Sequence, residues 1–333
     1  MTSLPVVRVV PFQPHCFAFG GFEVQMLAAM HAARKAGADV KPLDPWSRDS
    51  DFDVLHLWGC DIVHLETAKW ARLDGKKLVM SALYPYPSIQ ARLRYWASLF
   101  IGSARFRKPM LSWLSCITVV NQQQARYAID ILGIPEHLIL IVPNIVEDIF
   151  FEPPEKNIVS QIKVKDYVIC TGNICLRKNQ LSLIRACQRI GLSLLLIGDT
   201  LIGEEAYGNE IEAALNGISD MQWIRGLPPN SPDLVSAYHN SLIFALPSFN
   251  EQQPISALEA AAAGKPLLLS NRNFAKQELY TNAALAEPGS VLSIESALRE
   301  IMKSTRDYKV PINILNKCRR EIVGRLYFNA YGS

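Results

Sequence analysis

The sequence predicts an α/β protein made of two doubly wound domains, each a parallel sheet covered by helices on both faces. Three observations carry this prediction. Short apolar, β-rich runs alternate with segments of helical periodicity, this alternation occurs twice, and a segment rich in proline and charge separates the two series. At 333 residues the chain also exceeds the length that one hydrophobic core usually supports.

The first series of predicted strands ends at residue 142. Between its first two strands, GFEVQMLAAMHAARKAG repeats apolar residues at helical spacing and ends at Gly37, as a helix followed by a glycine cap does. The predicted strands of this series are residues 6–10, 39–43, 53–58, 77–81, 116–120 and 138–142.

The segment PNIVEDIFFEPPEKNIVSQIKVK, residues 143–165, interrupts the pattern and is predicted to be the linker. We place an N-terminal Rossmann-like domain at residues 1–150 and a C-terminal one at 160–305, with a last helix at about 309–333 that packs back on the first. Two such domains normally bind a ligand at the carboxyl ends of their strands, in the cleft between them. The strands of the second series are residues 167–172, 192–198, 221–224, 242–247, 266–270 and 283–287.

Composition excludes several classes of protein. With 49% hydrophobic and 20% charged residues, the chain is an ordinary globular protein, and a net charge of +3 gives no argument for nucleic acid. Seven scattered cysteines without a CxxC pair favour a reducing compartment over disulfides or zinc. Without a secretory signal or an apolar run of about 18 residues, the expected location is the cytoplasm.

The segment PSFNEQQPISALEAAAAGKP, residues 247–266, predicts an anion site. Pro254 favours the first turn of a helix, where the N–H groups of Ile255 and Ser256 have no intrahelical partner and can bind phosphate. Glu251, on the preceding loop, and Glu259, inside the helix, are suited to accept hydrogen bonds from sugar hydroxyls. The alternative is a solvent-facing acid and a helix-capping acid.

The segment YVICTGNICLRKNQLSLIRAC predicts a strand, a glycine turn and an amphipathic helix. Gly172 ends the strand, and Arg177 and Lys178 open the helix at the height of the predicted anion site. Two cations there would neutralise a diphosphate without a metal ion. The alternative is a basic pair on a solvated helix start.

Five motifs occur in order between residue 5 and about residue 305. In chain order they are the glycine loop AFGGFEVQ, the interdomain link IVPNIVEDIF, the turn TGNICLRKN, the segment WIRGLPPNSPDLVSAYHNSLIFALPS, and the two glutamates of E-x(7)-E. Together they resemble the retaining glycosyltransferases of family 4 (group 1). That family has the GT-B fold, in which two Rossmann-like domains face each other across a cleft.

The resemblance implies that the C-terminal domain binds a UDP-, GDP- or ADP-sugar and that the N-terminal domain binds a glycan or lipid-linked acceptor. Glu259 would bind the ribose, Glu251 the transferred sugar, and Arg177 and Lys178 the diphosphate. The expected activity is retaining, metal-independent hexosyl transfer in polysaccharide or glycolipid synthesis, with no cofactor. The further donor contacts implied are Gly20, Gly21, Gly172, Asn173, Ile224, Arg225, Ile255 and Ser256.

The sequence departs from the family at two places. Asn173 stands where the family has arginine, a charge that Arg177 is then expected to supply. Ser81, Leu83 and Tyr84 stand in the segment where the family often carries an active-site histidine, while His56, one strand earlier, is expected to pack in the core. This second departure favours an alternative, a catalytically silent relative that binds nucleotide sugar or a partner glycosyltransferase.

Two further features have alternative interpretations. Asp51 and Asp53 spell the DxD metal motif of the other glycosyltransferase fold, but they precede a strand, so a role in the loop-to-strand turn is expected. Residues 90–114 interleave arginines with aromatics, which suits an anionic membrane surface or a lipid-linked acceptor. The alternative for that segment is two amphipathic helices with snorkelling arginines.

Overall fold

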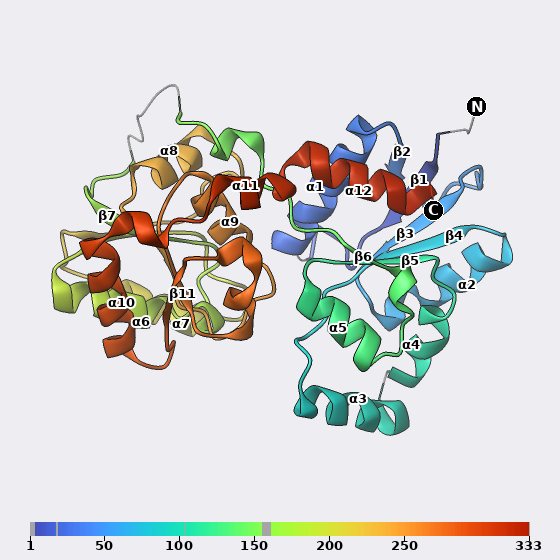
Figure 1. Ribbon diagram of the computed structural model, residues 1–333, viewed down its shortest axis with the longest axis horizontal. Helices are drawn as coiled ribbons and strands as arrows, with labels where there is room; N and C mark the ends of the chain where they lie inside the picture. Colours follow the sequence, from blue (N-terminus) through green and yellow to red (C-terminus); the bar gives the residue numbers. More distant parts are fainter. Residues whose placement is uncertain (1–3, 18, 103, 155–160, 333) are drawn as a thin grey trace. The chain divides into compact units, whose positions relative to one another are not determined.

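The computed structural model describes residues 4–17, 19–102, 104–154 and 161–332 (Figure 1). Small parts of four predicted segments lie outside these residues: 155–160 of the linker, Ala18 of the glycine loop, Ser103 of the segment 90–114 and Ser333 of the last helix. The chain forms two compact units, Met1–Ile145 with Lys317–Ser333, and Val146–Asn316. Each predicted strand is present within one residue of its expected ends.

The N-terminal unit contains one sheet in the order β2-β1-β3-β4-β5-β6, and all its pairings are parallel. The progression of the chain reverses between β1 and β3, which are neighbours in the sheet. The strands are β1 (Val6–Val10), β2 (Asp39–Pro42), β3 (Val54–Trp58), β4 (Lys77–Ser81), β5 (Cys116–Val119) and β6 (Ile139–Ile141).

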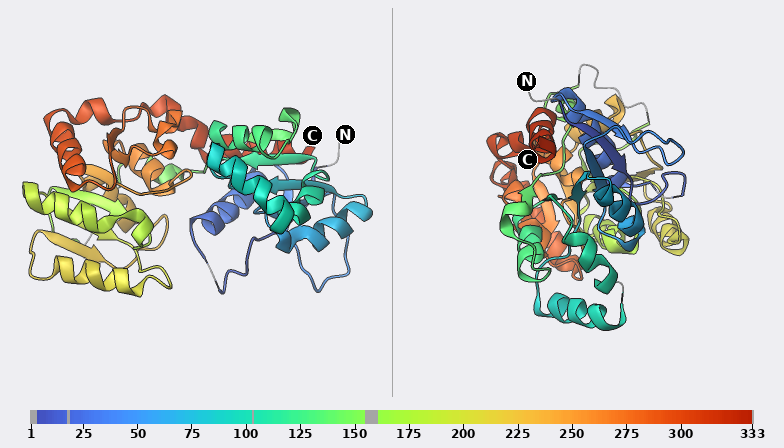
Figure 2. Two further views of the ribbon diagram at one scale, coloured as in Figure 1. Left: turned by 90° about the horizontal axis from the view of Figure 1, so that it is seen from below. Right: turned by 90° about the vertical axis from the view of Figure 1, so that its right-hand side faces the viewer.

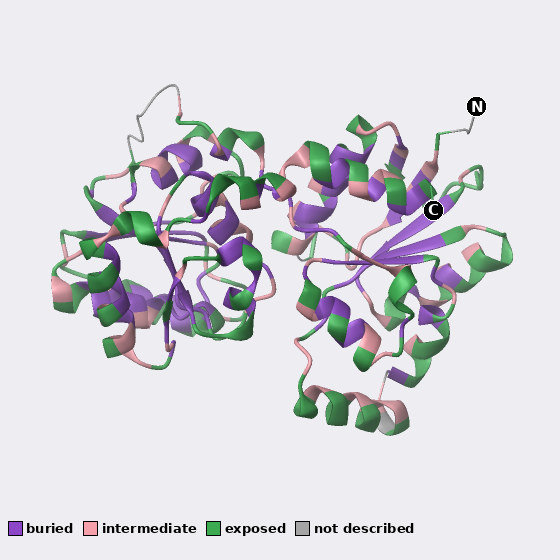
Figure 3. Ribbon diagram, viewed as in Figure 1, coloured by how far each residue is buried: buried purple, intermediate pink, exposed green. Residues whose placement is uncertain are grey.

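Both faces of this sheet are buried, which explains why its strands are apolar throughout. In β3, Val54 and Trp58 join one hydrophobic cluster, whereas Leu55 and Leu57 join the cluster on the opposite face. Figure 3 shows the central strands buried along their length. Helices α1 (Gly21–Lys35) and α12 (Arg320–Gly332) cover the first face, and α2 (Leu65–Leu73), α4 (Ala104–Leu111) and α5 (Gln122–Asp130) cover the second.

The C-terminal unit has the strand order β12-β11-β10-β7-β8-β9, again with only parallel pairings. This is the order of a dinucleotide-binding Rossmann sheet, with its reversal between β7 and β10. The strands are β7 (Tyr167–Thr171), β8 (Ser193–Ile197), β9 (Met221–Ile224), β10 (Ile243–Leu246), β11 (Leu267–Ser270) and β12 (Ala284–Ala286).

Helices cover both faces of this second sheet as well. Along one face α6, α7 and α10 pack side by side, and α8 and α9 pack along the other (Figure 1). No helix of the described residues is long and apolar enough to cross a bilayer. The helices are α6 (Gln180–Ile190), α7 (Glu205–Leu215), α8 (Pro232–Asn240), α9 (Ile255–Ala262), α10 (Val291–Lys303) and the short α11 (Ile312–Leu315).

The chain passes between the units twice. The first passage, at Ile145 and Val146, lies inside the predicted linker. The second lies after Asn316, not at about residue 309 as predicted from the sequence. The reason is α11, which packs on α9 and fully buries Leu315, so the chain leaves the C-terminal unit only afterwards.

The returning helix α12 packs closely on α1 because it carries a glycine at the contact. A Cβ at Gly324 would lie 2.5 Å from the carbonyl oxygen of Ala32, which is backbone and cannot move aside. Val323, Tyr327 and Tyr331 of the same helix are buried against the N-terminal core. The end of the chain is therefore an integral part of the N-terminal unit.

We expect Gly324→Ala to lower the unfolding free energy of the N-terminal unit by about 1–3 kcal/mol, because the added methyl group overpacks the α1–α12 contact. Thermal and urea unfolding of the full chain measure the effect. Gly332→Ala is the matched control, since a Cβ there would meet no atom within 4 Å. Equal unfolding midpoints for Gly324→Ala and wild type would contradict this expectation, because they would mean that α1 and α12 move apart to admit the methyl group at no cost in stability.

Candidate functional site

The candidate site lies where the C-terminal sheet reverses its progression. β7 and β10 are neighbours, but the chain continues from β7 toward β8 on one side and from β10 toward β11 on the other. The loops after the two strands therefore diverge above the carboxyl ends of the sheet, where open α/β sheets bind ligands. Arg177 and Lys178 follow β7, and Glu251 follows β10.

Glycine is required where the loop after β7 folds back over the strand ends. Gly172 has φ +118°, and a Cβ there would lie 2.9 Å from Nζ of Lys178. Gly198, which the sequence analysis did not single out, follows β8 with φ +145°, and its Cβ would lie 2.2 Å from the carbonyl oxygen of Gly172. The two glycines let the Lys178 ammonium lie directly against the turn.

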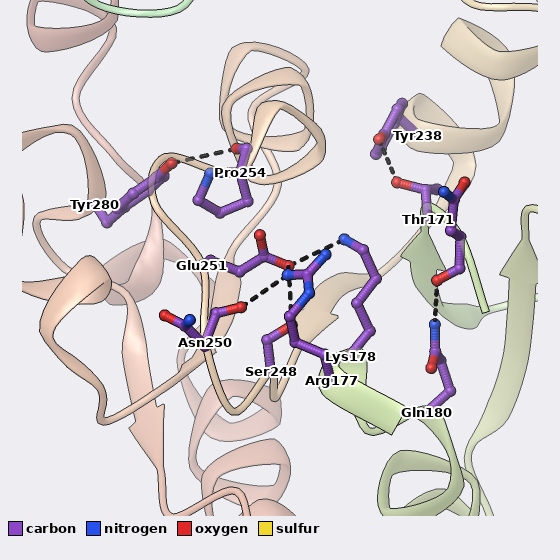
Figure 4. Close-up of polar contacts among 11 residues, drawn as sticks. Thr171, Arg177, Lys178, Gln180, Tyr238, Ser248, Asn250, Glu251, Pro254 and Tyr280 are labelled. Carbon is purple, nitrogen blue, oxygen red and sulfur yellow. Dashed lines mark hydrogen bonds and ion pairs between the residues drawn. The ribbon is translucent and has the colours of Figure 1, made fainter. Parts of the chain in front are cut away.

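The structure brings Arg177, Lys178 and Glu251 together in one ion cluster (Figure 4). Oε1 of Glu251 lies 2.6 Å from Nη1 of Arg177 and 3.2 Å from Nζ of Lys178. Arg177 also donates from Nη1 to the carbonyl oxygen of Asn250 at 2.7 Å. The side chains of Lys178 and Glu251 are only 10% and 12% exposed, whereas that of Arg177 is 45% exposed. Arg177 is thus the cation that faces solvent.

Electrostatics keep Glu251 ionised. Burial would raise the pKa of its carboxyl group, but the charges of Lys178 and Arg177 outweigh burial and hold the pKa below its usual value. Both cations and the hydroxyl of Ser248 use the same oxygen, Oε1. Within the described residues Oε2 has no partner, so it remains able to accept a hydrogen bond from a ligand.

Residues missed at the sequence level tie the two loops to each other. The amide of Asn179, which has φ 61°, donates to the carbonyl oxygens of Pro247 at 3.1 Å and Pro288 at 2.6 Å. The backbone N–H of Phe249 donates to the carbonyl oxygen of Arg177 at 2.8 Å. The basic pair and Glu251 are therefore held in register before any ligand arrives. In the sequence, Asn179 was visible only as the last residue of the turn TGNICLRKN, and nothing indicated its role in joining the loops.

The start of α9 is open to a ligand. Its N-terminal residue Pro254 makes no side-chain cap, and the N–H groups of Ile255 and Ser256 have no partner within the residues that the structure describes. The hydroxyl of Tyr280 donates to the carbonyl oxygen of Pro254 at 3.2 Å and fixes this end of the helix (Figure 4). The first turn thus presents two donors and the positive end of the helix dipole.

Glu259, one turn further into α9, has a different environment. Its Oε2 accepts a 2.8 Å hydrogen bond from the hydroxyl of Tyr238, and that hydroxyl lies 2.5 Å from Oγ1 of Thr171 at the end of β7. Burial raises the pKa of Glu259 to about 7, opposed by the Tyr238 bond and helped by the charge of Glu147. No pattern in the sequence had indicated Tyr238 as its partner.

Three predicted donor contacts take no part in the ion cluster. Asn173 is exposed, and its carbonyl oxygen accepts a 3.0 Å bond from the amide of Gln180. Ile224 and Arg225 lie at the carboxyl end of the edge strand β9, two strands from β7. The guanidinium of Arg225 lies 4.2 Å from the ring centroid of Trp223 and pairs with Glu212 at 3.2 Å. Its side chain is thus engaged on the surface of the unit.

In the N-terminal unit, Gly20 and Gly21 form the start of α1. The N–H of Gly20 donates to Oε2 of Glu23 at 2.9 Å, and the amide of Gln13 donates to Oε1 at 3.3 Å. Gly20 has an extended backbone, and a Cβ there would make only an ordinary contact at 3.6 Å. The fold of this unit therefore does not itself require glycine at position 20.

The segment in which the resemblance to family 4 implied a histidine holds a buried hydrogen-bond network. Oγ of Ser81 lies 2.8 Å from Nε2 of His56 and 2.7 Å from Oγ1 of Thr118, and Nδ1 of His56 lies 3.0 Å from the hydroxyl of Tyr331. Burial lowers the pKa of His56 to about 3, so the ring is neutral, and the expectation that it packs in the core is confirmed. Beside this network is a cavity of about 20 Å³, lined in part by Ser81 and Leu83.

The DxD aspartates serve the turn into the first sheet. Oδ2 of Asp53 accepts a 2.9 Å hydrogen bond from the N–H of Val6, and the N–H of Asp51 donates to Asp49 at 2.8 Å. Both contacts shape the entry to β3. The expected loop-to-strand role is therefore confirmed for the carboxylate of Asp53.

Comparison with known proteins gives one family match and several structural likenesses. Residues 153–316 match the family model described as glycosyl transferases group 1. The whole chain is similar to three solved structures: HepE of Anabaena in complex with UDP and glucose (TM-score 0.75, 13% identity, covering 99% of this chain and 100% of that one); a glycosyltransferase of Rickettsia africae (0.70, 13%, 99% and 98%); and sucrose-phosphate synthase of Thermosynechococcus elongatus (0.68, 15%, 98% and 95%). No curated protein sequence matches the chain.

These likenesses show that the chain has the GT-B fold, as the sequence predicted. The family match falls within the C-terminal unit and includes the ion cluster, the start of α9 and Glu259. At identities of 13–15% the structural neighbours establish the fold alone.

The environment of Glu259 predicts a pH-dependent stability. Because the folded pKa of about 7 exceeds the unfolded value of 4.5, Glu259 stabilises the fold below pH 4.5, and this contribution is lost as pH rises through 7. As the pH rises from 4.5 through 7, the free energy of unfolding of wild type should therefore fall by about 3 kcal/mol relative to that of Glu259→Gln. Urea unfolding of both proteins from pH 4.5 to 8 measures the difference. A difference that does not change with pH would refute the raised pKa.

Proposed function

We propose that this protein is a glycosyltransferase that moves a hexose from a nucleoside diphosphate sugar to a glycan or lipid-linked acceptor, in polysaccharide or glycolipid synthesis. The observation that carries the proposal is the Arg177–Lys178–Glu251 cluster beside the open first turn of α9. Cations, free N–H groups and a helix dipole meet at the switch point of a Rossmann sheet, an arrangement suited to a diphosphate. The group 1 glycosyl transferase match of the same residues supports this assignment.

The two glutamates have separate roles in the proposed donor complex. Oε2 of Glu251, which has no partner in the described part of the chain, accepts a hydrogen bond from a hydroxyl of the transferred sugar. Glu259 accepts from the ribose hydroxyls, with Tyr238 orienting its carboxylate. The ionised carboxylate accepts hydrogen bonds from the ribose hydroxyls more strongly than the protonated group, so donor affinity is expected to decrease as the pH falls below about 7.

The leaving diphosphate needs no divalent metal ion in this proposal. Arg177 and Lys178 together with the N–H groups of Ile255 and Ser256 stabilise the charge that develops as the glycosidic bond to phosphate breaks. HepE was crystallised with UDP and with UDP-glucose, which makes UDP-sugars the first donors to test, before GDP- and ADP-sugars.

Transfer proceeds with retention of configuration at the anomeric carbon. The bond between that carbon and the diphosphate oxygen breaks, and the acceptor oxygen bonds to the same face. The acceptor proton passes to the departing phosphate oxygen, so the protein supplies no general base. This scheme fits a chain whose Ser81 and Leu83 occupy the usual histidine position.

A second candidate is a catalytically silent relative that binds a nucleotide sugar or a partner glycosyltransferase. The observation that favours it is the buried Ser81–His56 network, in which the imidazole of His56 is neutral and enclosed. Donor binding is expected for a transferase and for a silent relative that binds nucleotide sugar, so turnover distinguishes these two.

Release of nucleoside diphosphate from UDP-, GDP- and ADP-hexoses, with a pool of glycan and lipid-linked acceptors, tests the proposal. We expect transfer to continue in EDTA and the product's anomeric proton to show the donor's configuration by NMR. Glu251→Gln should lower turnover more than donor affinity, because it removes the ionised acceptor for a hydroxyl of the transferred sugar.

Each other outcome has a definite meaning. An inverted product or a requirement for manganese would overturn the mechanism. Binding of donor without turnover for any acceptor would favour the silent relative. Absence of binding for all three donor classes would overturn the transferase and the silent relative that binds nucleotide sugar, and would favour a relative that binds only a partner glycosyltransferase.

A further inference from the structure

Helix α3 (Ile89–Ile101) presents one continuous apolar stripe to solvent. Ile89, Leu93, Trp96 and Phe100 are 80%, 64%, 57% and 74% exposed. They are spaced by four, three and four residues, which places them on the same side of a helix. Aligned side chains of this size are not the scattered exposed apolar residues of an ordinary surface.

The stripe faces away from the rest of the N-terminal unit. No described residue of α3 is buried, and the partly buried ones, among them Tyr95 and Leu99, lie on a different side of the helix. α3 packs on α4, and in Figures 1 and 2 it lies on the outside of its unit, away from the sheet. The apolar stripe therefore makes no contribution to the hydrophobic core.

The surface around the stripe is positively charged. Between Asp74 and Asp130 the sequence contains no acidic residue. Within the described residues Arg92 and Arg94 on α3 and Arg105 on α4 form no ion pair. The guanidinium of Arg105 lies 4.5 Å from the ring centroid of Phe106, which is itself 42% exposed. Both α3 and α4 therefore carry exposed aromatic rings together with arginines that form no ion pair in the described part of the chain.

We infer that α3 and the start of α4 dock on an anionic lipid bilayer. The stripe of Ile89, Leu93, Trp96 and Phe100 enters the boundary between headgroups and acyl chains, and Arg92, Arg94 and Arg105 contact anionic headgroups. A second copy of the chain fits this surface less well. In a two-fold dimer the arginines of one copy would face the same arginines of the other, without carboxylates between them.

This inference goes beyond the proposed function, since it depends on α3 and α4 and not on the ion cluster. Vesicle co-sedimentation of the full chain tests the inference without measuring activity. One set of vesicles contains only phosphatidylcholine, and the other also contains about 30% of the anionic lipid phosphatidylglycerol. We expect binding only to the anionic vesicles, with an affinity that falls as salt rises from about 0.05 to 0.5 M, because salt screens the arginines.

Two variants separate the contributions of charge and stripe. Arg92→Gln/Arg94→Gln/Arg105→Gln should weaken binding by roughly fivefold for each charge removed. Leu93→Ser/Trp96→Ser/Phe100→Ser should abolish binding while leaving the fold intact, because these side chains are exposed. Trp70→Ser/Leu73→Ser on α2 is the matched control: both residues are more than 60% exposed, but acidic Glu66 and Asp74 lie beside them.

Three results would overturn the inference. The first is equal binding to neutral and anionic vesicles, and the second is equal loss in the α2 control and the α3 variant. The third is a dimer by sedimentation velocity that the α3 variant dissolves and that does not bind vesicles, which would assign the stripe to a second copy.

Discussion

The carboxylate of Glu251, shared between two cations, is the interaction on which the candidate site depends. Lys178 is almost fully buried against the turn after β7, where an unpaired ammonium group would be costly. Glu251 provides the opposite charge from the loop after β10, and Asn179 holds the two loops in register. A diphosphate that binds here meets cations already in position, so little reorganisation accompanies binding.

The two glutamates of one sequence motif have opposite electrostatic states because their neighbours differ. Glu251 lies beside two cations and remains ionised, whereas Glu259 has only the hydroxyl of Tyr238 and a raised pKa. Such a separation of pKa values is frequent at functional sites. One segment therefore carries a carboxylate that stays ionised beside two cations and a second carboxyl group that ionises close to neutral pH.

The sequence contained enough information to predict the fold, since buried strands of parallel sheets are continuous apolar runs such as IFAL and YVICT. The sequence alone did not predict which side chains contact each other. Arg177 and Glu251, for example, are distant in the sequence and meet only because β7 and β10 are neighbours in the sheet. Tyr238 is one polar residue in an ordinary amphipathic helix, and the late return at Asn316 depends on the packing of Leu315. The aromatics of residues 90–114 were visible in the sequence, but their exposure on one side of α3 depends on tertiary structure.

The affinity of the double variant Arg177→Ala/Lys178→Ala for a nucleoside diphosphate tests the central claim most directly. Calorimetric titration would use whichever of UDP, GDP and ADP stabilises wild type most against heat, with Arg185→Ala/Arg189→Ala on the outer side of α6 as a control of equal charge. We expect the double variant to bind at least about a hundredfold more weakly and the control to bind as wild type does, since two charge-assisted contacts of about 1.5–3 kcal/mol each are lost. Unchanged affinity in a folded double variant would contradict the account.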